Sequence, residues 1–159
     1  MKSTSKGVLF LDFDGVICSD RAYLAAQQDK EKHVLRTLDP VSINLVDRLC
    51  QDFDLEVVIS STWRTRYPCP EILLTHGFRS SFHKDEKTPV SFGRTRGMEI
   101  SDWLEEHPEV TRYLIVDDCT DGLQDNFLTP HHVQTDQFDG FLTSHYYIAK
   151  KIMEKQNDL

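Results

Sequence analysis

The stretch Val8-Leu9-Phe10-Leu11-Asp12-Phe13-Asp14-Gly15 decides the fold that this sequence predicts. Four consecutive apolar residues are typical of a strand buried on both faces, as the strands of parallel sheets are. Two carboxylates and a glycine follow at once, and the glycine indicates that the strand has ended. The stretch therefore predicts a buried strand that brings Asp12 and Asp14 to one end of a sheet.

Three more strands and several helices follow in alternation. Leu55–Ile59 and Tyr113–Val116 are apolar strands, and His132–Thr135 is a shorter one. Between and after them the sequence predicts helices behind Asp39-Pro40, over 97–107 and after Ser144, with one or two exposed helices in 20–38. Residues 65–96 are expected to be irregular apart from a helical piece over 71–76. This order predicts an α/β fold, a doubly wound parallel sheet with helices on both faces.

Polar residues follow three of these strands. In a parallel sheet the carboxyl ends of the strands share one edge, so these residues should meet there; they are Asp12, Asp14, Ser60, Ser61, Asp117 and Asp118. Crowded carboxylates repel one another, and a divalent cation relieves that repulsion. Oxygen ligands without imidazole or thiolate favour Mg²⁺. One carboxylate could then attack phosphorus, while a second protonates the leaving oxygen.

Size, charge and cysteine content limit the other possibilities. The chain has 159 residues, which we expect to form one domain over 1–159, and a net charge of -8. That charge argues mildly against unspecific nucleic-acid binding, which needs basic residues. None of the four cysteines forms a CxxC pair, and the short apolar run at 8–13 cannot serve as a signal peptide or membrane span. We therefore expect a cytoplasmic protein with reduced thiols and no membrane partner.

The strand ends resemble the motifs of the haloacid-dehalogenase (HAD) superfamily. Residues 8–16 look like its first motif, 57–60 like the second and 114–118 like the fourth. The resemblance implies that Asp12 is the nucleophile and also touches the metal. It implies that Asp14 is the acid/base and lends its backbone carbonyl to Mg²⁺, that Ser60 binds the phosphoryl group, and that Asp117 and Asp118 hold Mg²⁺. The motifs span most of the chain.

A narrower resemblance points to one small branch of that superfamily. The stretches 60–64, 96–100 and 135–143 look like HAD domains found alone in bacteria and phages or attached to RNA-repair proteins. About 40 residues separate the first two motifs, which leaves room for little or no cap, with 17–38 as a small flap. An open site would admit a small phosphate ester or a nucleic-acid end.

The third motif departs from the usual pattern of the superfamily, which has a lysine there. We favour Arg96 as the cation, because it precedes Asp117 by 21 residues and lies just before the predicted helix that begins at Gly97. Arg94 is the next choice and Lys87 the third. Arg64 is a further candidate for phosphate binding, although an arginine after a strand is often simply solvated.

Other interpretations stay open beside this one. Asp121 is a third metal ligand or a helix cap, and Ser61 binds phosphate or only spaces the motif. His131 and His132 are adjacent and so face opposite sides of a strand, which disfavours a metal pair. Trp63 and Trp103 are expected in the core. The alternatives to a magnesium-dependent phosphomonoesterase are a phosphatase for RNA or DNA ends and a catalytically silent binding module, against which the intact Asp12 and Asp14 argue.

Overall fold

A computed structural model describes residues 6–26, 37–124 and 127–158 of the chain. In chain order its elements are β1 (Gly7–Leu11), α1 (Asp20–Ala25), α2 (Pro40–Phe53), β2 (Leu55–Ile59), the 3-10 helix η2 (Thr62–Thr65), α3 (Cys69–Thr75), β3 (Phe82–Lys87), α4 (Arg96–Glu106), β4 (Tyr113–Asp117), the 3-10 helix η3 (Thr129–His131), β5 (His132–Gln134) and α5 (Thr143–Asn157).

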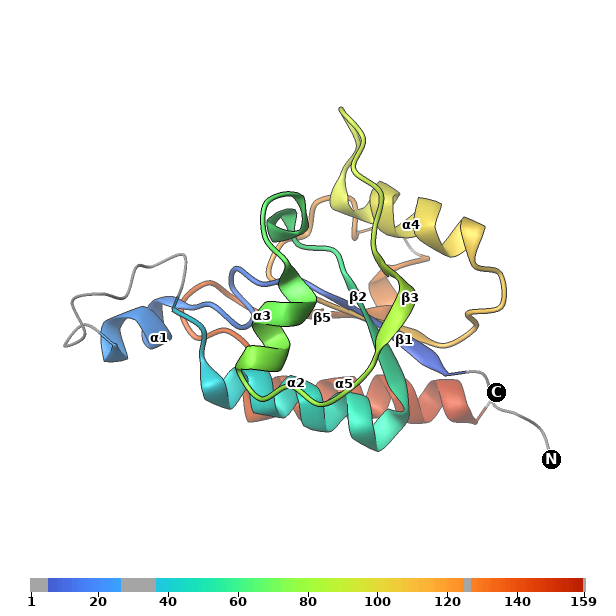
Figure 1. The fold of residues 1–159 in the computed structure, drawn as a ribbon. Coiled ribbons are helices and arrows are strands. Elements are labelled where there is room, and N and C mark those ends of the chain that lie inside the picture. The colour runs from blue at the N-terminus through green and yellow to red at the C-terminus, as the bar shows by residue number, and fades with distance from the viewer. Residues whose placement is uncertain (1–5, 27–36, 125–126, 159) are drawn as a thin grey trace.

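The sheet has five parallel strands in the order β3-β2-β1-β4-β5. β1 therefore lies in the middle, between β2 and β4, and all five residues of β1 and of β4 are buried. Helices lie on both faces, with α2 and α5 on one side and α4 on the other (Figure 1). The predicted doubly wound α/β fold is confirmed.

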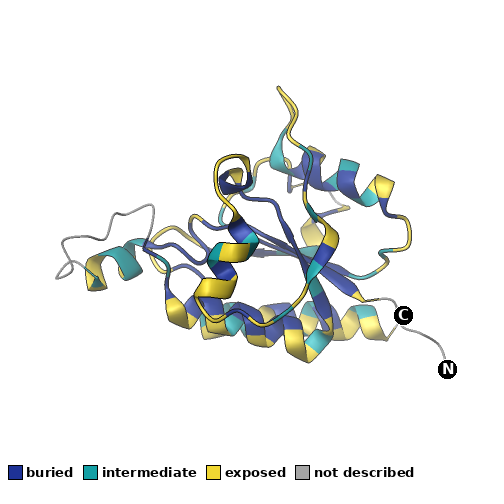
Figure 2. Ribbon diagram, in the orientation of Figure 1, coloured by how far each residue is buried: buried dark blue, intermediate teal, exposed yellow. Residues whose placement is uncertain are grey.

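Alternate residues of the strands belong to two separate hydrophobic clusters, one on each face of the sheet. Leu9 and Val57 belong to the cluster that α2 and α5 cover. Phe10 and Val58 belong to the cluster on the other face, which Trp103 of α4 covers. The central strands β1 and β4 are accordingly buried along their whole length, whereas the helices bury only their inner sides (Figure 2). This two-sided core is what makes the strand sequences continuously apolar instead of alternating.

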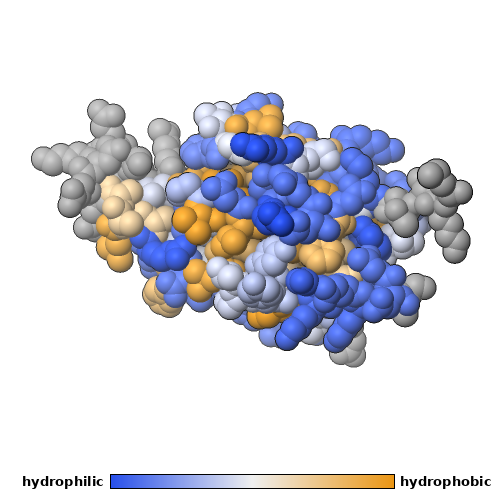
Figure 3. Space-filling model, turned by 90° about the horizontal axis from the view of Figure 1, so that it is seen from below, coloured by the Kyte–Doolittle hydropathy of each residue, from blue (hydrophilic) through white to orange (hydrophobic). Residues whose placement is uncertain are grey.

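The face that α2 and α5 form is mixed in polarity (Figure 3). Val41 on α2 is 57% exposed and Ile148 on α5 is 48% exposed. Asp39 caps α2 by accepting hydrogen bonds from the backbone N–H groups of Val41 and Ser42. None of the helices in the described ranges has both the length and the apolar character needed to cross a membrane.

β3 corrects the expectation that 65–96 is irregular outside one helical piece. Its six residues, Phe-His-Lys-Asp-Glu-Lys, form the strand at the edge of the sheet beside β2, and only His83 is buried. An edge strand faces water along one side, and charged residues there discourage pairing with other chains. Such a strand lacks the apolar run by which the other strands were recognised. Residues 27–36, which belong to the predicted helical region 20–38 and to the predicted flap, lie outside the described residues.

Candidate active site

The carboxyl ends of β1, β2 and β4 meet at one edge of the sheet. Leu11 pairs with Ile59 of β2 and with Val116 of β4, so the next residue of each strand comes out beside the others. Those residues are Asp12, Ser60 and Asp117. Their side chains are almost fully enclosed, with Asp12 5% exposed and the other two at 0%. The structure thus brings the three predicted motifs together.

Asp12, Asp117 and Asp118 form a carboxylate cluster. One oxygen from each lies within 4.8 Å of the other two. Burial, and then the negative charge of Asp12, raise the pKa of Asp117 to about 7 and the pKa of Asp118 to about 6. Enclosed carboxylates at this spacing are costly unless a cation offsets their charge. Their oxygen-only donor set fits Mg²⁺, so the residues present suit the ion that the sequence suggested.

Arg96 supplies one permanent cation beside this cluster. Its Nη1 lies 3.4 Å from Oδ1 of Asp12 and also forms an ion pair with Asp117. The Arg96 side chain is 13% exposed. Burial alone would lower the pKa of Arg96, but the two carboxylates outweigh this and raise it. The side chain therefore stays charged at the centre of the site.

The start of α4 is fixed against the loop that follows β4. Thr95 caps the helix by accepting from the N–H of Met98, and Asp121 accepts from the N–H of Arg96 through its carboxylate and from Gly97 through its carbonyl. A Cβ on Gly97 would overlap the carbonyl of Gly122, so only glycine permits this approach. Asp121 is therefore a helix cap, and the N-terminal end of α4 binds protein groups instead of presenting free N–H donors to an anion.

Asp14 faces solvent, unlike Asp12. Its Oδ2 accepts a hydrogen bond from Nε1–H of Trp63 at 3.0 Å. Burial raises the pKa of Asp14, and this hydrogen bond partly opposes the rise. A cavity of about 320 Å³ opens beside it, lined by Asp14, Thr62, Trp63, Thr65, Arg66 and Tyr67. Trp63 is buried as predicted, but its contact with Asp14 was not foreseen.

Gly15 lets the first motif turn sharply beneath Asp118. Its φ is +71°, a conformation that residues with a side chain rarely adopt, and a Cβ there would overlap the Asp118 carboxyl group. The carbonyl of Gly15 accepts a hydrogen bond of 2.6 Å from Thr135 Oγ1, which follows β5. The turn after β1 is thus packed against Asp118, which follows β4, and hydrogen-bonded to Thr135, which follows β5.

Ser60 and Ser61 occupy different environments although they are adjacent. Ser61 Oγ accepts a hydrogen bond from the N–H of Trp63 and so caps η2. Ser60 Oγ is buried and has no hydrogen-bond partner among the described residues. Buried hydroxyls normally have a partner, so the unpaired Ser60 hydroxyl at this position is what a phosphoryl-binding serine would show before its ligand arrives.

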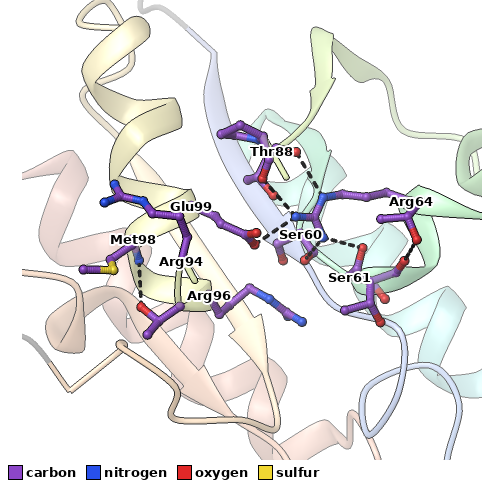
Figure 4. Close-up of polar contacts among 12 residues, drawn as sticks. Ser60, Ser61, Arg64, Thr88, Arg94, Arg96, Met98 and Glu99 are labelled. Carbon is purple, nitrogen blue, oxygen red and sulfur yellow. Dashed lines mark hydrogen bonds and ion pairs between the residues drawn. The ribbon is translucent and has the colours of Figure 1, made fainter. Parts of the chain in front are cut away.

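Arg64 does not reach into the site (Figure 4). All five of its N–H donors are bound within the protein: to the carbonyls of Ser60, Ser61, Thr88 and Pro89 and to the carboxylate of Glu99. Its side chain is only 3% exposed. No donor is left for a phosphate, so Arg64 belongs to the scaffold that joins β2 to α4.

Arg94 also lies away from the cluster. Its guanidinium pairs with Asp102 on the surface of α4, and it points away from Arg96 in Figure 4. Lys87, the third candidate for the cation, ends the edge strand β3 and lines a cavity with Pro89 and Trp103. Of the three candidate cations, the structure pairs only Arg96 with Asp12.

The adjacent histidines His131, at the end of η3, and His132, at the start of β5, contact separate backbone groups. His131 Nδ1 lies 3.1 Å from the carbonyl of Tyr113, and His132 Nε2 lies 3.0 Å from the carbonyl of Asp117. They therefore do not converge on one point.

The fold and the strand ends define a class of protein, an α/β domain of the HAD type. A family model described as the HAD domain in Swiss Army Knife RNA repair proteins matches residues 8–146, and the chain belongs to this family. No curated protein and no solved structure gives a significant match. Membership supports a HAD-type phosphatase in general terms.

Proposed function

We propose that this protein is a magnesium-dependent phosphomonoester hydrolase that works through a phosphorylated Asp12. The observation that carries this proposal is the position of Asp12: its carboxylate is 5% exposed, lies 3.4 Å from Arg96 and shares a cluster with Asp117 and Asp118. A carboxylate held so close to a cation and to two potential metal ligands is suited to attack an electrophile that carries negative charge.

The two chemical steps follow from the residues on the first motif. In the first, an oxygen of Asp12 forms a bond to phosphorus while the bond from phosphorus to the ester oxygen breaks, and Asp14 gives its proton to that leaving oxygen. In the second, Asp14 takes a proton from water, the resulting hydroxide bonds to phosphorus, and the Asp12–phosphorus bond breaks to release phosphate. The exposed position of Asp14 beside a cavity gives the leaving group and the water access to it.

The remaining residues hold the phosphoryl group. Arg96 offsets the charge that builds up between Asp12 and the phosphate oxygens, and Ser60 Oγ donates its free hydrogen bond to one of them. Asp12, Asp117 and Asp118 would hold Mg²⁺ through oxygen, together with the backbone carbonyl of Asp14 that the family resemblance implies. The ion would neutralise phosphate oxygens and shield the nucleophile from them.

The test is hydrolysis of p-nitrophenyl phosphate by wild type and Asp12→Asn, each with Mg²⁺ and with excess chelator. We expect turnover only by wild type with Mg²⁺, because an amide is a poor nucleophile toward phosphorus. Asp139→Asn, which changes an exposed carboxylate outside the cluster, serves as the control and should be fully active. Near-normal activity in Asp12→Asn, or full activity in chelator, would contradict the proposal.

Nucleic-acid ends are a second candidate substrate, which the cavity beside Asp14 favours. Tyr67 is 38% exposed there, and its ring lies 5.1 Å from the ring of Trp63. Arg66 lines the same cavity. An exposed aromatic ring next to a cation is suited to stack on a base and bind a phosphate. The family description, which refers to RNA repair proteins, agrees with this choice.

Comparing two substrates separates the candidates. If oligonucleotide ends are the substrate, Tyr67→Ala should raise KM for a phosphate-ended oligonucleotide and leave p-nitrophenyl phosphate turnover unchanged. Tyr67→Phe is the matched control and should keep normal KM, since it keeps the ring. Equal kinetics of all three proteins on the oligonucleotide would rule this candidate out.

A further inference from the structure

Three side chains with metal-binding atoms meet where β3 packs on the end of α4. His83 and Asp85 are two apart on β3 and so lie on the same face of the strand, while His107 ends α4. One potential ligand atom from each lies within 4.8 Å of the others. None of the three belongs to the carboxylate cluster or takes part in the chemistry proposed for it.

Trp103 fixes both imidazole rings. The ring of His107 stacks on it at 3.8 Å between centroids, and the ring of His83 packs edge-on at 4.9 Å. The two histidines are 6% and 9% exposed. Trp103 Nε1–H also donates to the carbonyl of Asp85 at 3.1 Å, which fixes the strand at that residue. The rings are therefore held in place without a ligand, so little ordering is needed to bind one.

The hydrogen bonds of His107 leave its second ring nitrogen facing the carboxylate of Asp85. Its Nδ1 lies 2.7 Å from the carbonyl of Trp103, and a carbonyl only accepts, so Nδ1 carries a proton. The other nitrogen, Nε2, lies 2.8 Å from Oδ2 of Asp85. On a neutral imidazole Nε2 carries a lone pair, which is free to bind a metal ion that the carboxylate of Asp85 also contacts. A histidine that donates one N–H to a backbone carbonyl is the usual arrangement of a metal ligand.

We propose that His83, Asp85 and His107 form a second metal site, which takes Zn²⁺. Two imidazoles and one carboxylate are ligands that Zn²⁺ accepts, whereas Mg²⁺ prefers oxygen alone. His83 Nδ1 accepts a hydrogen bond from the N–H of Asp85 at 3.1 Å, and His83 exchanges that bond for the ion.

The fourth ligand comes from the cavity on which this site opens. The cavity measures about 550 Å³, and Glu106 and Glu109 line it together with Lys84 and Lys87. Three protein ligands leave one position of a tetrahedral zinc ion for water or for one of these glutamates. The bound ion would fasten the edge strand β3 to α4, the helix whose other end carries Arg96.

The test uses the metal alone and does not depend on catalysis. Chelator-treated Asp12→Asn protein, in which the nucleophile is removed, is titrated with Zn²⁺ by calorimetry and by thermal unfolding. We expect one zinc ion per chain and a rise in Tm that grows with zinc concentration above the dissociation constant. In the same background, Asp85→Asn and His83→Gln should each weaken binding at least about 10-fold, since even loss of a group that only orients a metal ligand typically weakens binding about 10–100-fold.

Matched variants and a second ion distinguish this site from adventitious binding. His76→Gln changes an exposed histidine and Cys119→Ser an exposed thiol, and both should leave zinc binding unchanged. Co²⁺ should give visible absorption of a four-coordinate centre, which Asp85→Asn abolishes. Asp85 is exposed, so that variant is expected to fold. No zinc binding by the parent, or unchanged binding by Asp85→Asn and His83→Gln, would overturn the proposal.

Discussion

The indole N–H of Trp63 donates a 3.0 Å hydrogen bond to Oδ2 of Asp14. Trp63 itself packs between Phe13 and Tyr67, with ring centroids 5.1 Å from each. A side chain from η2 thereby sets the direction of the carboxyl group that we propose as acid and base. The relationship connects η2, which follows the second motif, to the first motif.

Replacing Trp63 with phenylalanine should lower kcat on an alkyl phosphate by on the order of 10-fold, since a positioned general acid contributes roughly 10²–10⁴ and only its orientation is lost. An aromatic ring remains between Phe13 and Tyr67. On p-nitrophenyl phosphate the loss should be smaller, because that leaving group needs little protonation. Steady-state kinetics on both substrates checks this, and equal losses on the two would show that Trp63 does not act through Asp14.

Arg96→Ala should reduce kcat on p-nitrophenyl phosphate by on the order of 10²–10³, the usual cost of removing one charged contact in the transition state. Arg94→Ala and Lys87→Ala are the matched controls and should stay close to wild type, since Arg94 pairs with Asp102 and Lys87 lies at the edge strand. An inactive Lys87→Ala beside an active Arg96→Ala would assign the role of the cation to Lys87 at the end of β3.

Arg64→Met should destabilise the protein by about 3–5 kcal/mol, the range found when one partner of a buried ion pair is removed. Glu99 would lose its partner, and the carbonyls of Ser60, Ser61, Thr88 and Pro89 would lose theirs. Urea unfolding measures the change in the free energy of unfolding. Arg66→Met, at an exposed neighbour, should change it little. A stable Arg64→Met with impaired phosphate binding would instead restore the functional role.

The Asp85–His107 pair should make stability depend on pH when chelator is present. Burial alone would lower the pKa of His107, but its hydrogen bonds to Asp85 and to the Trp103 carbonyl raise it above the usual value. The hydrogen bond with His107 lowers the pKa of Asp85. A raised histidine pKa contributes stability that is complete below about pH 6.5 and disappears as pH rises through the folded-state pKa.

The measurement is the free energy of unfolding of wild type minus that of Asp85→Asn, taken between pH 5.5 and 8.5, that is, from about one unit below to about two units above the ordinary histidine pKa. We expect the difference to be largest at the acidic end and to shrink toward the alkaline end. A difference that grows with pH would mean that His107 is not protonated in the folded protein.

Sequence patterns predicted the sheet where strands are buried on both faces. The three central strands are rich in apolar residues, and their carboxyl ends bring polar residues to a single edge, so both fold and cluster could be predicted. β3 could not, because an edge strand is polar and resembles a loop. His83 and Asp85 have the alternate spacing of a strand face, which is the one signal that could have revealed it.

Side-chain roles that depend on burial were harder to predict than the cluster itself. Arg64 follows a strand in the same way as a phosphate ligand would, and only the structure shows that its donors are already bound. The sequence allows Asp121 to be a helix cap or a metal ligand, and its hydrogen bond from the N–H of Arg96 identifies it as a cap. Trp63 was assigned to the core from its residue type, and its hydrogen bond to Asp14 depends on how η2 turns after β2.

Trapping the covalent intermediate tests the central claim most directly. Asp14→Asn should still be phosphorylated by p-nitrophenyl phosphate, whose leaving group needs no acid, but should hydrolyse the intermediate slowly. Acid quenching followed by borohydride reduction converts a phosphorylated aspartate to homoserine, which peptide mass spectrometry locates. The account predicts homoserine at residue 12 in Asp14→Asn, and none in the Asp12→Asn/Asp14→Asn double variant. Homoserine at residue 117 or 118, or p-nitrophenol release by Asp14→Asn with no modified residue 12, would contradict it.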